Sequence, residues 1–111
     1  MSFLETLFWL GVLHAFTDYV FQPEAMARYK EPDSTPPPGY GPWWFSALAH
    51  GLVNAGGVAL VTSVGCGLGE LILHPVIDYL KCTHRIGAVT DQLLHASCKL
   101  LWATLTLQGV R

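Results

Sequence analysis

Charged residues are scarce in this sequence. Lysine, arginine, aspartate and glutamate make up 13% of its 111 residues, about half the share usual in soluble proteins. Hydrophobic residues make up 51% and the mean hydropathy is +0.38. This composition favours an integral membrane protein over a compact soluble helical bundle. The formal net charge is −2, so the sequence has no excess of basic residues and we expect no nucleic-acid partner.

Cysteine is also rare, and no two cysteines form a C-x-x-C pair. The three cysteines, Cys66, Cys82 and Cys98, are predicted to be small apolar fillers rather than a disulfide framework. The first apolar run has no basic residues before it and contains His14 and Asp18, so we expect a retained helix rather than a signal peptide. The length leaves room for a single domain, residues 1–111.

Hydrophobic runs and breakers predict four helices, at about residues 3–22, 43–63, 69–81 and 88–107. Pro23 ends the first helix, and residues 24–30 have a weak helical pattern. The segment 31–42 holds five of the seven prolines and is predicted to be an irregular loop. The glycines of residues 65–69 predict a tight turn before a short third helix, in which Pro75 favours a kink.

One motif occurs twice. Leu13–Tyr19 and Leu73–Tyr79 both read L-H-x-x-x-D-Y, which places a histidine and an aspartate on one face of a helix. The two copies fall on the first and third helices, which run parallel in an up-down bundle. The fold class that we predict is therefore all-α, a four-helix transmembrane bundle built from two pseudo-repeated helical hairpins.

The polar residues of all four helices are predicted to share one depth. At a rise of about 1.5 Å per residue, four histidines lie roughly 10–14 Å from the loop-side helix ends and three aspartates roughly 5–8 Å. Asp91 and His95 reverse the order of the motif, as an antiparallel helix requires. The predicted layer consists of His14, Asp18, His50, His74, Asp78, Asp91 and His95.

Imidazole and carboxylate groups together are ligands for divalent metals, zinc above all and also manganese or iron. We therefore predict that the seven residues of the layer are metal ligands, in one site or a two-metal site. Candidate catalytic residues are Asp18, Asp78, Asp91 and Lys81, with Gln22, Lys30 and Gln92 as partners of substrate or ligands. Two alternatives stay open: histidine–aspartate pairs that only hold the helices together, and a proton or ion pathway.

Three charged residues have other interpretations. Lys81 can pair with Asp78, bind a phosphate or extend to the membrane interface. Glu70 is expected at the start of the third helix, at the end opposite the layer, where it suits the helix dipole. No role is predicted for Lys99, and the half of the bundle near residues 65–69 is expected to be apolar, which disfavours ion conduction.

Basic residues gather at the helix ends nearest the layer: Arg28, Lys30, Lys81 and Arg85. The positive-inside rule then predicts a multi-pass protein of the bacterial inner membrane, with the layer toward the cytoplasm and both termini outside. The lipid bilayer is the expected partner. Homo-oligomers are a further expectation, with Gly51, Gly56 and Gly57 as a contact face.

The assembled motif H-x-x-x-D-Y-x-x-Q, M-A-x-x-K, H-x-x-x-D-Y-x-K and D-Q-x-x-H resembles a family of small bacterial and phage membrane proteins, domain of unknown function 3307. The matching positions are His14, Asp18, Tyr19, Gln22, Met26, Ala27, Lys30, His74, Asp78, Tyr79, Lys81, Asp91, Gln92 and His95. The resemblance implies the membrane fold and the polar site, and it implies no activity.

Three functions follow as hypotheses. The first is a metal-dependent hydrolase in the membrane, acting on a lipid-linked or amphiphilic substrate, with an aspartate as general base and Lys81 or Lys30 attracting a phosphate. The second is a proton or metal-ion transporter. The third is a non-catalytic phage or bacterial accessory protein with a structural polar layer.

Overall fold

Four long helices run alternately back and forth in the computed structural model, which describes all 111 residues. The chain is all-α, as predicted, and contains one further short helix and a π-helical turn. In chain order the elements are α1 (Phe3–Ala15), the π-helical η1 (Phe16–Val20), α2 (Glu24–Tyr29), α3 (Trp43–Val61), α4 (Val64–Cys82) and α5 (Ala88–Leu107).

Side-chain caps fix the start of two helices. At α1, Ser2 Oγ accepts from the backbone N–H of Glu5, and the Glu5 carboxylate accepts from the backbone N–H of Ser2, which together form a capping box. At α4, Ser63 Oγ accepts from the backbone N–H of Cys66 at 3.1 Å. The predicted tight turn at residues 65–69 is therefore wrong, because α4 begins five residues earlier than Gly69.

Glycine within α4 allows that helix to approach α3 closely. A Cβ added at Gly67 would lie 2.8 Å from Ala59 Cβ and 2.9 Å from the backbone oxygen of Ala55. On the same interface, a Cβ at Gly51 would lie 2.9 Å from Pro75 Cγ. The glycines that favour a turn in isolation thus serve helix packing in the folded chain.

The first L-H-x-x-x-D-Y copy ends in a π-helical turn. The backbone N–H of Phe21 donates to the oxygen of Phe16, five residues earlier, at 2.7 Å. Thr17 and Asp18 in this turn are buried. The second copy lies wholly in the regular helix α4, so the two copies differ in backbone geometry. Such π turns occur frequently at functional sites.

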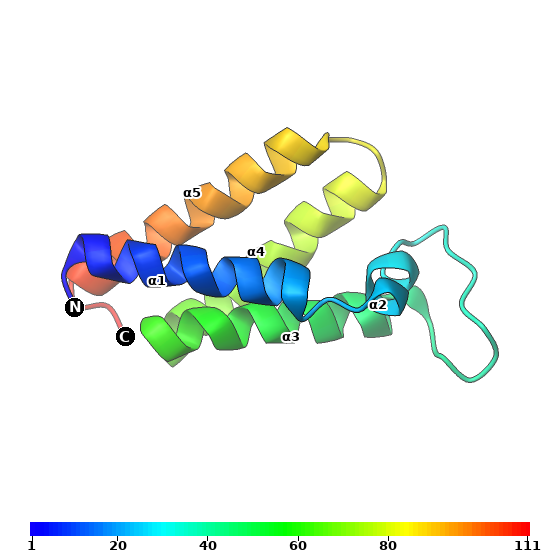
Figure 1. The fold of residues 1–111 in the computed structure, drawn as a ribbon, viewed down its shortest axis with the longest axis horizontal. Helices are drawn as coiled ribbons and strands as arrows, with labels where there is room; N and C mark the ends of the chain where they lie inside the picture. The colour runs from blue at the N-terminus through cyan, green and yellow to red at the C-terminus, as the bar shows by residue number, and fades with distance from the viewer.

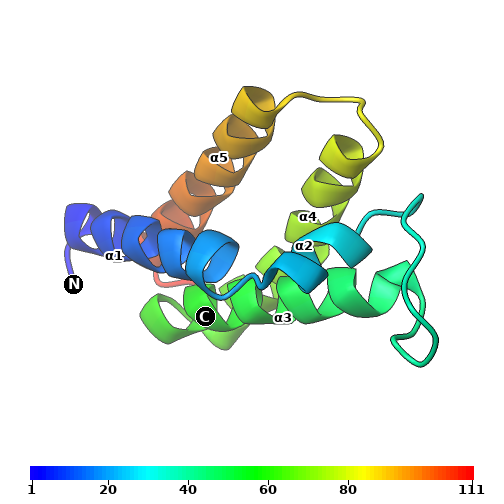
Figure 2. The ribbon, with the colours of Figure 1, turned by 45° about the vertical axis from the view of Figure 1, so that its right-hand side comes forward.

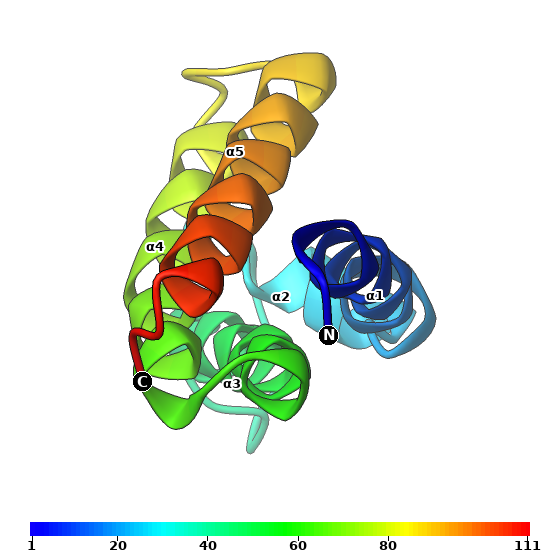
Figure 3. The same ribbon diagram turned by 90° about the vertical axis from the view of Figure 1, so that its left-hand side faces the viewer.

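The long helices form two antiparallel pairs, α1 with α3 and α4 with α5, and the two pairs are inclined to each other (Figures 1 and 2). α3 and α4 make the most extensive contact, while α1 packs against α3 and α5. α4 and α5 run as an antiparallel pair away from α1 and α3 to the loop 83–87, and Figure 3 shows α1 and α3 nearly end-on with α4 and α5 inclined to them. Both termini lie at one end of the molecule, and α2 with the proline-rich loop 31–42 lies at the other.

The interior is divided between an apolar core and a polar layer. The core cluster occupies the half near the termini and consists of Leu10, Val58, Cys66, Trp102 and Ala103. The loop-side half is polar, so thirteen of the 24 buried residues are polar or charged. Large hydrophobic side chains are instead exposed along every long helix, among them Phe8, Leu52, Ile72 and Leu93. This distribution inverts that of a water-soluble bundle.

Only α3 is both long and apolar enough to cross a membrane by length and composition. The charged residues of α4 and α5 lower their mean hydropathy, although four of them, Glu70, Asp78, Asp91 and Lys99, are buried inside the bundle.

Candidate functional site

Histidine and acidic side chains from η1 and three helices converge in the polar layer. Their ligand atoms form three overlapping groups in which all atoms lie within 4.8 Å of one another. The first group is Asp18, His50, His74 and Asp78; the second is Asp78, Asp91 and His95; the third is Glu70, His74 and His95. All of these residues are buried, and six of the seven predicted ligands are among them.

Asp18 contacts two of the histidines. Its Oδ1 lies 2.9 Å from His50 Nε2 on α3 and 3.4 Å from His74 Nε2 on α4. The π-helical turn of η1 carries this carboxylate, and Gln22 donates to the backbone oxygen of Asp18 at 3.0 Å. Asp18, the carboxylate of the first L-H-x-x-x-D-Y copy, therefore faces His74, the histidine of the second copy.

Asp78 is the centre of the cluster. Its Oδ2 lies 3.4 Å from both His50 Nε2 and His74 Nε2, and it accepts from Lys30 Nζ at 2.9 Å. Its Oδ1 lies 3.3 Å from His95 Nε2 on α5. Lys30 is thus the lysine that pairs with Asp78, rather than Lys81.

Asp91 and Gln92 complete the layer on α5. Asp91 Oδ1 lies 3.4 Å from His95 Nε2, and its Oδ2 lies 3.9 Å from Lys81 Nζ. Gln92 Nε2 donates to Asp91 Oδ2 at 3.0 Å and to Asp18 Oδ2 at 3.2 Å. The amide of Gln92 therefore links a carboxylate of α5 to the carboxylate of η1.

Glu70 belongs to the site, and its expected place at the far end of the bundle is wrong. The carboxylate is fully buried and lies 3.2 Å from His74 Nδ1. Lys99 Nζ and Trp102 Nε1 donate to its two oxygens, each at 2.5 Å. Lys99, for which the sequence predicts no role, is the counter-ion of Glu70. The signal for Glu70 was its four-residue spacing from His74.

His14 occupies the edge of the layer. Its Nε2 contacts Gln92 Oε1 at 3.0 Å and lies 3.6 Å from Asp18 Oδ2. It is not part of any of the three groups of ligand atoms. Asn54, one turn from His50, donates to the backbone oxygen of His50 at 3.0 Å and accepts from Thr17 Oγ1 at 2.8 Å, so it connects α3 to η1.

Hydrogen bonding prepares His74 to bind a metal. Because an ionised carboxylate only accepts, the Nδ1 of His74 donates its hydrogen to Glu70, and Nε2 is the nitrogen that faces Asp18 and Asp78. This Nε2 is buried without a hydrogen-bond partner, and so is Asp91 Oδ1. A histidine whose second nitrogen donates to a carboxylate is the usual arrangement of a metal ligand. The donor set of histidine nitrogens and carboxylate oxygens fits a divalent ion.

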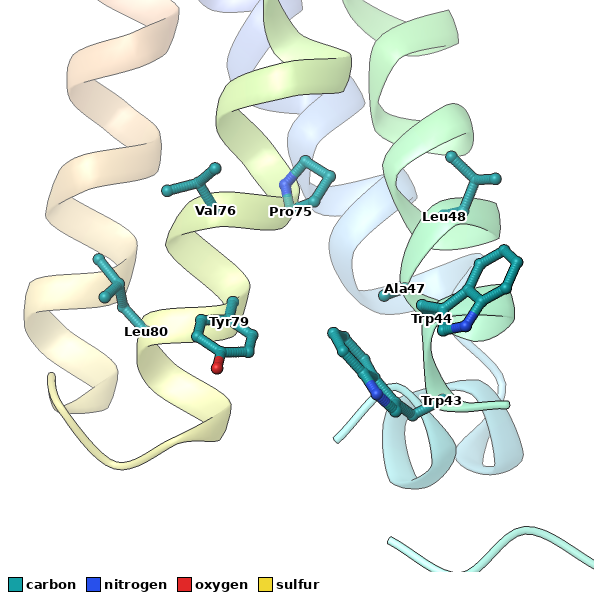
Figure 4. A pocket seen from close by; sticks show the side chains of 8 residues that line it. All are labelled: Trp43, Trp44, Ala47, Leu48, Pro75, Val76, Tyr79 and Leu80. Carbon is teal, nitrogen blue, oxygen red and sulfur yellow. The ribbon is translucent and has the colours of Figure 1, made fainter. Parts of the chain in front are cut away.

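Two cavities lie near the loop-side ends of the helices. Figure 4 shows an apolar groove of about 400 Å³ between α3 and α4, where Trp43 extends toward Tyr79 and where Pro75, next to His74, lines the wall. A second cavity, of about 390 Å³, lies at the loop side of the bundle. This loop-side pocket is lined by polar side chains and by the start of α5, including Gln22, Lys30, Glu31, Lys81, His84 and Gly87.

In comparisons with protein-family models, with curated proteins and with solved structures, the chain matches none of them.

Proposed function

We propose that this chain is a membrane-embedded protein that binds one divalent metal ion, zinc in the first place, and uses it to hydrolyse an amphiphilic substrate. One observation carries the proposal. His50, His74, Asp18 and Asp78 bring two imidazole nitrogens and two carboxylates from three segments of the chain to within 4.8 Å of one another, in a buried site. Two histidines and two carboxylates make a four-coordinate set of the kind that zinc prefers.

The balance of buried charge supports a single ion. Four carboxylates are buried, those of Asp18, Glu70, Asp78 and Asp91, against the two buried ammonium groups of Lys30 and Lys99. Metal ligation requires neutral imidazoles, and in that state the layer would carry two negative charges in a medium where uncompensated charge is costly. One divalent cation neutralises them, whereas two cations leave an excess of positive charge.

The remaining side chains supply the other parts of a hydrolytic site. A bound divalent ion polarises water or a phosphoryl or carbonyl oxygen. Asp91 is outside the four-ligand group and its Oδ1 is free of hydrogen bonds, so we assign it as the general base. Glu70 holds His74 in the required tautomer, and Gln92 positions Asp91. The apolar groove of Figure 4 at the same end of the bundle supports a substrate with a hydrophobic portion.

A bilayer is the solvent that suits the exposed surface. Buried residues are mostly polar, and large hydrophobic side chains face outward on all four long helices. At about 1.5 Å per residue, α3, α4 and α5 are each roughly 28–30 Å long, the thickness of a hydrocarbon core. We propose a four-helix transmembrane bundle of two related hairpins in a bacterial inner membrane, and a place in the domain of unknown function 3307 family.

We propose that this end faces the cytoplasm and that both termini lie outside, because four basic residues near the layer satisfy the positive-inside rule. Labelling of a cysteine at Ser34 in the proline-rich loop by a membrane-impermeant maleimide tests the orientation. We expect labelling in inverted vesicles and none in intact cells.

A structural layer is the second candidate. The Lys30–Asp78 and Lys99–Glu70 pairs partly neutralise the layer without metal, which favours helix association as its role. Conduction has less support, because the apolar cluster around Leu10, Val58 and Trp102 closes the bundle between the layer and the termini.

The test is the metal content of the detergent-purified protein by elemental mass spectrometry, beside the His14→Ala/His74→Ala variant. We expect close to one zinc, manganese or iron per chain in the wild type and none in the variant. Phospho- and acyl-lipid hydrolysis is then assayed with the loaded protein and with Asp91→Asn, which should retain metal and lose activity. Absence of metal after reloading contradicts the proposal and leaves the structural role.

A further inference from the structure

The loop-side pocket joins the polar layer to the aqueous side of the bundle. Lys30 is its most buried polar residue, only 8% exposed, and its ammonium group lies 2.9 Å from Asp78. Lys81, whose side chain is 45% exposed, lies at the rim and 3.9 Å from Asp91. The pocket therefore extends from solvent to the residues that contact the two carboxylates.

The chemistry of the pocket favours an anion. Lys30, Lys81 and His84 line it, against Glu31 as the one acidic residue. The start of α5 also lines it at Gly87 and Ala88, and Gly87 provides no side-chain cap. The first backbone N–H groups of a twenty-residue helix, with the positive end of its dipole, thus add to the two ammonium groups.

From this arrangement we infer that the loop-side pocket binds a phosphate group, the head of the substrate on which the proposed metal site acts. The inference rests on the proposed function for its link to catalysis. In the structure, each lysine lies beside a carboxylate of the layer, Lys30 by Asp78 and Lys81 by Asp91. A divalent ion bound at the cluster would share the Asp78 carboxylate with Lys30, which would make that ammonium group more available to a phosphate, and the half-exposed Lys81 would reach the same group from the rim. Metal and phosphate therefore strengthen each other's binding.

The backbone conformation that places His84 at the pocket is energetically unfavourable for a residue other than glycine. Its φ is +61°, a left-handed conformation that glycine favours and that costs other residues about 1–2 kcal/mol. Two hydrogen bonds impose it: His84 N–H donates to the oxygen of Lys81, and Arg85 N–H donates to the oxygen of Leu80. This is the Schellman end of a helix, where glycine is the usual residue. Replacement by glycine thus removes the imidazole and relieves the turn.

The experiment measures binding of radiolabelled dioleoylphosphatidic acid to the immobilised full-length protein in detergent, with unlabelled dioleoylglycerol and sn-glycerol 3-phosphate as competitors. We expect Lys81→Ala to weaken binding about tenfold, the value of one charge-assisted contact. His84→Gly should weaken binding with no fall in the unfolding temperature. Arg28→Ala is the matched control, since Arg28 is basic, exposed and paired with Glu24 on α2 outside the pocket.

The competitors identify the source of the phosphate. Displacement of the labelled phosphatidic acid by sn-glycerol 3-phosphate indicates a soluble phosphate ester. Displacement only by added unlabelled phosphatidic acid, and by neither other competitor, indicates a lipid headgroup; both results support the pocket. Displacement by dioleoylglycerol as effective as that by phosphatidic acid, or equal loss in Lys81→Ala and Arg28→Ala, overturns it. Metal content measured on the same samples separates the two proposals. Bound metal without phosphate binding rejects this inference alone, and phosphate binding without metal rejects only the metal site.

Discussion

The carboxylate of Glu70 lies 3.2 Å from Nδ1 of His74, one turn along α4, and it is the only acidic group on that nitrogen. The other nitrogen of the same ring lies 3.4 Å from Asp18 and from Asp78. One imidazole therefore connects the cluster of Asp18, His50 and Asp78 to the buried ion pair between Glu70 and Lys99. The stability of the bundle and the chemistry of the site are linked through this ring.

Glu70→Gln should destabilise the protein by about 3–5 kcal/mol, because it leaves the ammonium group of Lys99 buried without its counter-charge. The double variant Glu70→Gln/Lys99→Met should recover a large part of that loss. Unfolding by sodium dodecyl sulfate in mixed micelles, followed by circular dichroism, measures both. If the double variant costs as much as the single variants Glu70→Gln and Lys99→Met added together, the pair is not coupled.

His74→Ala should abolish metal binding, whereas His14→Ala should keep nearly all of it. His74 belongs to two groups of ligand atoms and His14 to none, since its Nε2 faces Gln92. Titration with zinc against a competing chelator gives both affinities. Equal losses in the two variants would place His14 among the ligands and contradict the four-residue set.

Gly67→Ala should lower the free energy of unfolding by about 1–3 kcal/mol, as expected for overpacking. Its new Cβ would meet Ala59 and the backbone of Ala55 on α3. Gly56→Ala on α3 is the control, because nothing lies within 4 Å of an added Cβ there, and it should be neutral or stabilising by up to about 1 kcal/mol. The same detergent unfolding assay compares them, and a harmless Gly67→Ala would show that α3 and α4 pack less closely.

Ile72→Lys should prevent stable insertion into the membrane. Ile72 is exposed near the middle of α4, where a lysine costs about 2.5–3.5 kcal/mol in a bilayer and almost nothing in water. Val89→Lys, exposed in the first turn of α5, should insert normally because its ammonium group can reach the interface. Carbonate-resistant membrane association is the measurement. A soluble, folded Ile72→Lys protein would reject the membrane assignment.

The sequence allowed prediction of much of the fold and of the layer, because both rest on spacing along single helices. The four-residue interval of His74 and Asp78 places both side chains on one face whatever the surroundings, and counting residues placed His50 and His95 at the same depth. The expected range 88–107 is that of α5 in the structure.

Contacts between helices were not predictable, because periodicity does not fix how each helix rotates against its neighbours. Lys30 and Asp78 are 48 residues apart, and Glu70 and Lys99 are 29 apart. The start of α4 was missed for another reason. Gly65, Gly67 and Gly69 favour a turn locally, but close packing against α3 and Trp102 requires residues without a side chain, and the cap at Ser63 was the overlooked signal.

The π-helical turn at Asp18 gives the two halves of the site different backbone geometry. Asp78 and His74 lie in a regular helix that packs against α3, whereas Asp18 lies in a π-helical turn of five residues that ends shortly before Pro23. A wide turn differs from regular helix by a one-residue slip. If the cluster holds a metal as we propose, such a slip would move the Asp18 carboxylate to suit ions of different radius, while His74 and Asp78 would stay in place on α4.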